Sequence, residues 1–512
     1  MKKAATVIMA LAMAFSMGAC TVNSPSPPPE NPPEKPPEEE IVMPDGEQEV
    51  YKFITLYNAA ESKSVGTNEA VFSIEKDTQK GRYLKLELEN DVDVLGTFTY
   101  SNTQTSKAMT ERFYVPAGKA GEKTEFRQFL DAFRTVANPA SKTGDDESKA
   151  AIGQARKASW LKSVSFASIG GKTGTIKLHS VEASDRTINA TKQLYLQNEH
   201  YKIGTDFAYG GALTYLEKLP ENGQTLELTS YESGGNKYAY IGINASQTAG
   251  KDPVNVDKSV NLIDTHDTGR LIQQSYYGSA EGYEGIKYDG KPWRYNPVQG
   301  GDVYNNISQI IDYRLFEDEI YIKARAMDWA RDGYTTPSYM EGRYRLEGEL
   351  VYVTNTFTDW SGKNNDVMRS QEMPATYFHY ALTHFVAYRG QNPWTGGALK
   401  QVTDLPFWGN SHDLHPDTEF HDGTENWIAW TNDLLYGVGV YVPGVNIFLN
   451  GMYGDKLASA ASSTNYTAPI VNRNFESYRR DEYTFLLAVG NVQDMREQFK
   501  AVHDSGKINN KF

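Results

Sequence analysis

Short segments in which apolar and polar residues alternate recur over most of the chain, and they constrain the fold more than any other feature. In residues 81–90 (GRYLKLELEN), Leu84, Leu86 and Leu88 alternate with charged residues. Residues 343–360 contain two such segments around a Glu-Gly-Glu turn. A period of two is typical of strands that bury one face. The sequence therefore predicts an all-β fold of antiparallel strands.

Two segments have the spacing of helices instead. Residues 125–136 carry apolar side chains at positions three to four apart, and residues 492–504 place Met495, Phe499 and Val502 on one side. Such spacing predicts amphipathic helices. With only these two segments, we expect few helices.

The strand-like segments fall into two groups. Residues 161–184 consist of a strand-like segment, a Gly-Gly turn and a second strand-like segment, which predicts a hairpin. This segment resembles the last strands of jelly-roll carbohydrate-binding modules. We therefore predict a jelly-roll-like β-sandwich over residues 50–185, with a carbohydrate-binding character implied by the resemblance.

A second unit is predicted over residues 190–512. The run KIGTDFAYGGALTYLEK, the segment NLIDTHDTGR and the hairpin at residues 343–360 together resemble galactose-mutarotase-like supersandwich domains. The resemblance implies a large antiparallel sheet whose concave face holds the ligand-binding residues. It also implies that this second unit carries the catalytic function.

The N-terminus predicts export and anchoring. Lys2 and Lys3 precede an apolar stretch that ends in Gly-Ala-Cys20, the layout of a secretory signal. The small residues before a sole cysteine resemble a lipobox, which implies lipidation at Cys20; an ordinary signal peptide is the alternative. The proline-rich residues 21–49 favour an extended tether. We thus expect residues 1–20 to anchor a lipoprotein to a membrane, at the cell surface or in the periplasm.

Composition excludes several classes of function. The chain has 51 Lys and Arg against 65 Asp and Glu, a formal net charge of −14, and no cluster of basic residues, which argues against a nucleic-acid partner. Its single cysteine excludes disulfides, cysteine catalysis and thiolate metal sites. There is no nucleophile elbow, phosphate-binding loop or dinucleotide fingerprint. We expect a monomer without an organic cofactor.

Residues 261–278 form the densest group of residues able to carry chemistry. We predict that Asp264 and Asp267 are catalytic carboxylates, and that the substrate is bound by His266, Arg270, Gln274 and Tyr276. Arginine can hold an anionic group with two hydrogen bonds, and amides can bind sugar hydroxyls. A polar turn with a structural Asp–Arg pair is the alternative interpretation.

Residues 369–385 supply a second group, in which we predict that Glu372 and His379 are catalytic. Glu372 lies between apolar residues near Pro374. A carboxyl group in a partly apolar site has a raised pKa and can act as an acid. An exposed glutamate at a strand end is the alternative. The five-residue spacing of His379 and His384 suits a metal pair on neither a strand nor a helix.

Residues 412–425 are rich in histidine and acidic residues and include Pro416 and Gly423. Such a loop could hold calcium or zinc, but it lacks the acid spacing of an EF-hand loop. We therefore assign no metal ligand and no cofactor, with calcium as the alternative.

Several aromatic residues are flanked by proline or glycine, which favours exposed loops. Among them, Trp394 and Trp408 are predicted to stack on sugar rings. For any single tryptophan, a place in the hydrophobic core is the alternative.

Together these features predict a glycoside hydrolase acting on an external polysaccharide or oligosaccharide. Glu372 would be the proton donor and Asp264 or Asp267 its partner, because hydrolysis requires two carboxyl groups beside the scissile bond. A polysaccharide lyase acting on a uronate-containing glycan, a non-catalytic glycan-binding lipoprotein and a sugar epimerase remain alternatives.

Overall fold

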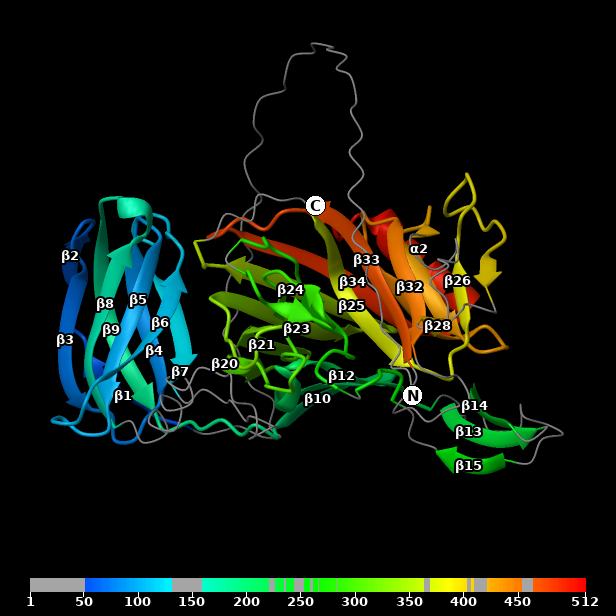
Figure 1. Cartoon of the computed structure of the whole chain (residues 1–512), viewed down its shortest axis with the longest axis horizontal. Helices are drawn as coiled ribbons and strands as arrows, with labels where there is room; N and C mark the ends of the chain where they lie inside the picture. The colour runs from blue at the N-terminus through cyan, green and yellow to red at the C-terminus, as the bar shows by residue number, and fades with distance from the viewer. Residues whose placement is uncertain are drawn as a thin grey trace, which may run out of the picture.

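The computed structural model of the chain (Figure 1) describes residues 51–130, 159–220, 226–233, 236–243, 253–257, 261–265, 267–281, 283–362, 369–402, 407–408, 421–453 and 464–512. The predicted signal sequence, the lipidation site Cys20 and the tether lie outside the described residues. So does most of the candidate metal loop.

The N-terminal part of the described chain is a sandwich of two antiparallel sheets, drawn in blue to cyan in Figure 1. One sheet contains β1 (Phe53–Tyr57), β2 (Glu61–Val65), β4 (Tyr83–Asn90), β7 (Thr124–Phe129) and β9 (Gly174–Ser184). The other contains β3 (Ala70–Asp77), β5 (Val94–Ser101), β6 (Met109–Val115) and β8 (Trp160–Ser168). Leu84, Leu86 and Leu88 of β4 are fully buried between them, as their alternation predicts.

Two local predictions in this part are wrong. The segment 161–184 is not a hairpin: β8 and β9 belong to opposite sheets and are joined across Gly170 and Gly171. The segment 125–136 begins as strand β7 rather than as a helix, paired with β4 from Thr124 to Phe129. In both cases pairing with strands distant in sequence decides the outcome, and local patterns carry no information on such partners.

The second part of the chain contains two large sheets. The nine-stranded sheet consists, in spatial order, of β20 (Gln309–Leu315), β21 (Glu319–Arg325), β23 (Ser338–Glu347), β24 (Leu350–Asp359), β34 (Arg480–Asn491), β31 (Tyr436–Tyr441), β30 (Trp427–Thr431), β26 (His384–Ala387) and β27 (Lys400–Val402). The predicted hairpin at residues 343–360 is confirmed as β23 and β24.

The eight-stranded sheet consists, in spatial order, of β22 (Met327–Asp328), β19 (Pro297–Val298), β16 (Gln273–Ser275), β25 (Arg369–His379), β33 (Thr464–Arg473), β32 (Ile447–Tyr453) and β28 (Phe407–Trp408), with β29 (His421–Asp422) also paired to β32. Its strands pair antiparallel, except β28 with β32.

Smaller sheets complete the described elements. They are β10 (Gln193–Gln197) with β11 (Tyr201–Asp206) and β12 (Ala212–Lys218); β13 (Leu226–Ser233) with β14 (Asn236–Ile243) and β15 (Pro253–Asp257); and β17 (Lys287–Tyr288) with β18 (Lys291–Pro292). At the turn before β12, Gly210 has φ 60° and a Cβ there would lie 1.8 Å from the carbonyl oxygen of Gln299, so only glycine fits. The prediction of an all-β fold with few helices is confirmed.

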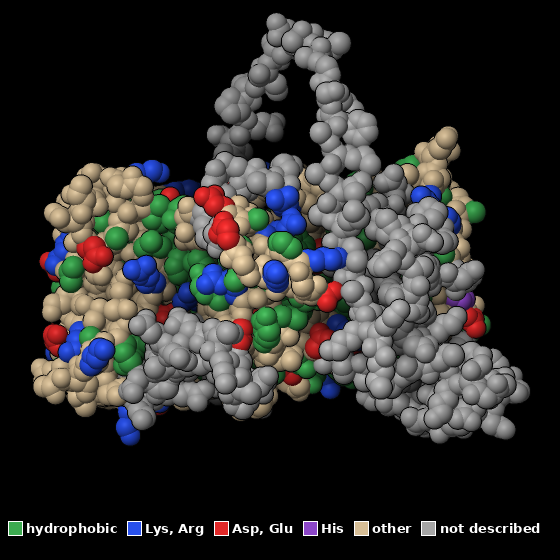
Figure 2. Space-filling view, viewed as in Figure 1, with side chains coloured by type: hydrophobic (Ala, Val, Ile, Leu, Met, Phe, Trp, Pro, Cys, Tyr) green, Lys and Arg blue, Asp and Glu red, His purple; other side chains and the backbone are tan. Residues whose placement is uncertain are grey.

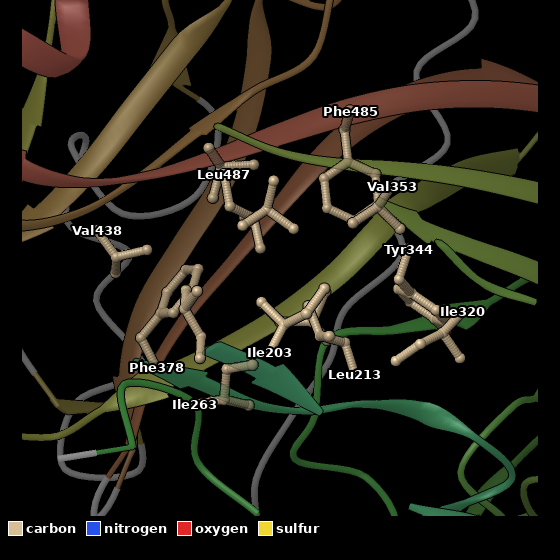
Figure 3. Packing of buried hydrophobic residues seen from close by; sticks show 14 of the residues in the cluster. Ile203, Leu213, Ile263, Ile320, Tyr344, Val353, Phe378, Val438, Phe485 and Leu487 are labelled. Carbon is tan, nitrogen blue, oxygen red and sulfur yellow. The ribbon is translucent and has the colours of Figure 1, made fainter. Parts of the chain in front are cut away.

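The main hydrophobic core lies between the two large sheets and the sheet of β10 to β12 (Figure 3). Phe378 of β25 and Phe485 and Leu487 of β34 all belong to this core. The intervening Leu486 faces the opposite side of the nine-stranded sheet, as the period of a strand requires. That outer face is covered by helix α2 (Val492–Ser505), which confirms the C-terminal helix.

The outer face of the eight-stranded sheet carries a separate small apolar cluster. Ala375 of β25 and Tyr466, Ala468 and Ile470 of β33 form it, with Tyr377 packed alongside. This outer face is therefore less apolar than the core face of the same strands. Its tyrosines lie between small apolar side chains.

The sandwich contacts the second part of the chain through buried polar groups. The Tyr83 hydroxyl donates to the Asp312 carboxylate at 2.6 Å, and the Arg186 guanidinium lies 3.9 Å from the centre of the Tyr313 ring. In the face shown in Figure 2, basic side chains are interspersed with acidic ones over the described surface.

Candidate functional site

Glu372 lies on β25 where the pairing with both neighbouring strands is irregular. The register with β33 shifts between Glu372 and Thr376, and the pairing with β16 is also irregular. Tyr377 is five positions after Glu372, an odd offset, so a regular strand would place the two side chains on opposite faces. Yet Tyr466 donates a hydrogen bond to Glu372, and its ring centre is 4.8 Å from that of Tyr377. The β-bulge thus brings both side chains to the outer face of the sheet.

The Glu372 carboxyl group is held by tyrosine hydroxyls. Tyr277 donates to its Oε1 at 2.9 Å, and Tyr466 donates as well. Burial raises the pKa of Glu372, and the two hydroxyls oppose this rise only in part. A carboxyl group in this state keeps its proton to higher pH than an ordinary glutamate and can act as a proton donor.

Tyr377 links Glu372 to the predicted residues near position 267. Burial is the main reason that the pKa of Tyr377 lies well above its usual value, and the negative charges of Glu372 and Asp267 raise it further. The positive charge of Arg270 opposes them. All three groups therefore lie close to the Tyr377 hydroxyl, which stays protonated and can only donate or share its proton.

Asp267 and Arg270 are held together by a turn. Asp267 Oδ1 accepts hydrogen bonds from the amides of Gly269 at 2.8 Å and Arg270 at 3.0 Å. Arg270 Nε lies 3.3 Å from Asp267 Oδ2, and its Nη1 lies 3.8 Å from Asp264 Oδ2. The Asp264 side chain is 7% exposed and that of Asp267 is 40% exposed, so Asp267 is the carboxylate that reaches solvent.

We call the residues that converge on this face the Glu372 cluster. They are Asp267, Arg270, Tyr277, Glu372, Tyr377 and Tyr466. The structure thus brings together three residues predicted from sequence, namely Asp267, Arg270 and Glu372.

Aromatic rings line one side of the cluster. Tyr288 lies 5.0 Å from the ring of Trp293 and 5.7 Å from that of Trp329, and Trp293 lies 6.3 Å from Tyr277. The charge of Asp267 adds to the burial that raises the pKa of Tyr288, which ties these rings to the cluster. Both tryptophans are partly exposed, so part of each indole can contact a ligand.

Two of the predicted substrate-binding residues are internal. Tyr276 is 1% exposed and its ring packs between Phe357 and Phe475. Its hydroxyl donates to Gln274 Oε1 at 2.9 Å, and Gln274 Nε2 donates to the carbonyl oxygen of Glu341. These contacts fasten the strand that precedes Tyr277 to the core.

The other predicted histidine, His379, lies at the C-terminal end of β25. It is 9% exposed, its Nδ1 accepts a hydrogen bond from the Ala381 amide at 3.1 Å, and its ring stacks on Tyr380. His384 lies 3.0 Å from a carboxylate oxygen of Asp433. The two histidines therefore have different surroundings.

Trp394 lies far from the cluster. Its ring stacks on His503 of α2 at 4.8 Å and packs against Tyr441, and its amide donates to Glu425. These contacts place it with α2, on the outer face of the nine-stranded sheet, with the main core between it and Glu372.

Three other tryptophans lie in the hydrophobic core, which is the alternative that the sequence left open for any single tryptophan. Trp360 is 6% exposed, and Trp427 and Trp430 are fully buried. The last two lie on β30, an interior strand of the nine-stranded sheet, so their place in the sheet overrides the flanking sequence.

Some predicted residues lie outside the described part of the chain. These are His266, the side chain of Trp408 and residues 409–420. Among the residues that the structure describes, no three histidine, cysteine or acidic side chains gather in a way that could hold a metal ion. Within the same residues, no helix has the length and apolar character needed to cross a bilayer.

A cavity of about 330 Å³ lies away from the cluster, at the start of α2. Its lining includes Lys218, Glu349, Tyr436, Asn491 and Asp494. No member of the Glu372 cluster lines it, so we do not connect it with the chemistry of Glu372.

Sequence reasoning missed Tyr377, Tyr466, Tyr288 and Trp329. Tyr466 is separated from Glu372 by almost a hundred residues, and only strand pairing brings them together. One signal was available for Tyr377: a proline inside a strand-like segment, here Pro374, often marks a bulge. A bulge after Glu372 would have placed both side chains on one face.

Comparison with known proteins gives no match to a protein family and no match among curated proteins. Solved structures of similar fold include a galactose mutarotase-like protein from Lactobacillus casei ATCC 334, with 11% identity and a TM-score of 0.32, covering 58% of this chain and 100% of that one. A galactose mutarotase related enzyme from Lactobacillus acidophilus has 10% identity and a TM-score of 0.31, covering 58% and 97%.

A third similar structure is an alpha-mannosidase from Enterococcus faecalis V583. It has 7% identity and a TM-score of 0.30, and the match covers 89% of this chain and 44% of that one. Likeness at this level says nothing about activity.

Proposed function

We propose that this protein is a glycoside hydrolase that acts on an external glycan, with Glu372 as proton donor. The observation that carries the proposal is the state of Glu372, a carboxyl group with a raised pKa that is held by tyrosine hydroxyls on the outer face of a sheet. Cleavage of a glycosidic bond requires a proton for the departing oxygen, and a carboxyl group of raised pKa supplies it near neutral pH.

Asp267 is proposed as the second carboxyl group. It is more exposed than Asp264, and its charge reaches the same tyrosine hydroxyl as that of Glu372. In hydrolysis, Glu372 protonates the leaving oxygen, while Asp267 stabilises the positive charge that develops on the sugar or activates the attacking water. Arg270 and the rings of Tyr288 and Trp293 would position the sugar.

The state of Tyr277 and Tyr377 argues against a lyase reaction in which either of these tyrosines is the base. A lyase needs a base that removes a carbon-bound proton, and a tyrosine can do so only as a phenolate. The pKa values of Tyr277 and Tyr377 are both well above their usual range because of burial and the nearby carboxyl groups. Both hydroxyls therefore stay protonated at neutral pH and act as donors.

The test is a screen of the full-length protein against a panel of polysaccharides. Release of reducing ends is the expected result, whereas new ultraviolet absorbance from an unsaturated sugar would indicate a lyase. Glu372→Gln should lower the rate of release by about 10²- to 10⁴-fold, the usual contribution of a general acid. Glu69→Gln, at an exposed position of the sandwich, is the matched control.

Three outcomes would contradict the proposal. Binding without release of sugars would identify a glycan-binding protein. Unsaturated products would identify a lyase. A Glu372→Gln variant as active as the Glu69→Gln control would show that the chemistry takes place elsewhere.

A further inference from the structure

Two arginines flank the Tyr277–Glu372 pair without belonging to it. Arg369 is the first residue of β25, three residues before Glu372. Arg294 follows Trp293, whose ring lies 6.3 Å from Tyr277. The positive charge of Arg294 acts on the Tyr277 hydroxyl, the same hydroxyl that donates to Glu372. Both arginines are partly buried, so they stand at the edge of the candidate site.

The two arginines lie on segments that meet beside Tyr277: the Gly278 amide donates to the carbonyl oxygen of Tyr295 at 2.8 Å, and Gln371 Nε2 donates to that of Tyr277 at 2.8 Å. Burial lowers the pKa of Arg294, and the charge of Arg369 lowers it further. No carboxylate takes part in this effect. Two like charges in a partly buried place are unfavourable unless an anion lies between or beside them.

Neither arginine is ion-paired within the described residues. The absence is unusual for this site, because Arg270 lies beside Asp267 at 3.3 Å and Arg473, opposite Arg369 on β33, pairs with Asp481. In addition, Arg369 Nε is buried and has no hydrogen-bond partner in the part of the chain that the structure describes.

We infer that Arg294 and Arg369 bind an anionic substituent of the substrate, a carboxylate or a sulfate on the sugar that lies beside Tyr277 and Glu372. The planar guanidinium group donates parallel hydrogen bonds that match the oxygens of either anion. The inference rests on the proposed function for the statement that the ligand is a glycan. It narrows the substrate from glycans in general to acidic glycans.

The inference also assigns distinct roles to the arginines of this face. Arg270 is ion-paired with Asp267 and its charge acts on Tyr377, whereas the charge of Arg294 acts on Tyr277. A neutral sugar would leave these two cations without a counter-charge among the residues that the structure describes. An acidic sugar would supply one, so binding of an acidic sugar would be favoured.

The experiment uses the full-length Glu372→Gln variant, in which binding can be measured without turnover. Its retention is compared on polygalacturonate, on carboxyl-reduced polygalacturonate, on the sulfated galactan carrageenan and on neutral galactan. We expect retention on at least one anionic polymer and little on the neutral ones. Polygalacturonate alone would identify a carboxylate as the anion, and carrageenan alone would identify a sulfate.

Arg294→Gln and Arg369→Gln, each added to Glu372→Gln, should weaken retention on the anionic polymer by roughly 10- to 100-fold, the usual worth of a hydrogen bond to a charged group. Arg112→Gln removes the same charge at an exposed position of the sandwich and should have no effect. Arg369→Lys keeps the charge but not the paired hydrogen bonds, so its retention should lie between that of Glu372→Gln alone and that of the variant with Arg369→Gln. Inorganic sulfate should raise the melting temperature of the Glu372→Gln protein. It should not raise the melting temperature of the variant that carries Arg294→Gln and Arg369→Gln in addition.

The two proposals fail in different ways. If a neutral glycan is bound or cleaved equally by the parent and by the arginine variants, the anion site is wrong while hydrolysis stands. If anionic glycans are bound through the arginines but the unmodified protein releases no sugar from them, hydrolysis is wrong while the anion site stands. No retention on any anionic polymer, together with no effect of sulfate on melting, overturns the anion site.

Discussion

Two glutamates on opposite sides of the larger part of the molecule show how differently a buried carboxyl group can be used. Glu425 is fully buried and accepts two hydrogen bonds from Arg496, at 2.5 and 2.8 Å. It also accepts hydrogen bonds from the Trp394 amide and the Trp427 indole. Since Arg496 lies on α2, these contacts fasten the helix to the outer face of the nine-stranded sheet.

Among the described residues, no cation forms an ion pair with Glu372. In the described part of the chain its hydrogen bonds come from the neutral hydroxyls of Tyr277 and Tyr466, and burial raises its pKa. Neutral donors hold a carboxyl group in place without requiring that it be ionised. The comparison suggests that Glu425 stabilises the structure, whereas Glu372 is free to gain and lose a proton.

The largest expected effect on stability comes from Glu425→Gln. This change leaves Arg496 charged and buried without the carboxylate it pairs with, and loss of one member of a buried ion pair typically lowers the free energy of unfolding by about 3–5 kcal/mol. Glu372→Gln is the matched variant, and we expect it to change the free energy of unfolding by less than about 1 kcal/mol. Urea unfolding of both variants measures the difference. Equal losses would show that Glu372 is also a structural acid.

A smaller effect is expected in double-mutant cycles. Glu425→Gln combined with Arg496→Met should give a coupling energy of about 2 kcal/mol, because the two charges meet in a buried place. Glu372→Gln combined with Tyr277→Phe should couple by at most about 1 kcal/mol, the value of a single hydrogen bond between a neutral donor and its acceptor. Both cycles use the same unfolding measurement. Coupling of similar size in the two cycles would remove the distinction between the sites.

The smallest expected effect is a shift in the pH dependence of activity. The Tyr277 hydroxyl donates to Glu372 and favours its ionised form, so it lowers the pKa of that carboxyl group. Tyr277→Phe therefore raises the pKa of Glu372. If Glu372 must be protonated to act, activity falls as pH rises through its pKa, and the alkaline limb of kcat/KM moves to higher pH in the variant.

Tyr466→Phe should move the alkaline limb in the same direction, because Tyr466 also donates to Glu372. Tyr195→Phe, at an exposed tyrosine of β10, should leave the pH profile unchanged. A limb that stays in place in both cluster variants would mean that another group governs the alkaline loss.

Much of the candidate site was within reach of the sequence, although its geometry was not. Asp267, Arg270 and Glu372 were predicted from their chemistry and their neighbours, and they lie in one cluster. Gln274 and Tyr276 come from the same dense segment but point into the interior. The course of the strand decides which polar residues of a segment face a ligand. A local sequence pattern does not predict that course.

Taken alone, the sequence determined the period of the strands and the C-terminal helix. The buried leucines of β4, the hairpin of β23 and β24, and α2 (Val492–Ser505) follow from alternation, turn residues and helical spacing. These features depend on neighbours within a few residues, which is why they can be read locally.

Only the tertiary structure decided which strands pair and where their side chains point. It placed β8 and β9 in opposite sheets, made β7 a strand, and moved Tyr377 to the face of Glu372 through a bulge. It also placed the Arg496 guanidinium beside Glu425 and the hydroxyls of Tyr277 and Tyr466 beside Glu372. Partners distant in sequence supply all of these contacts, and the burial they create, rather than residue type, sets the chemistry of each carboxyl group.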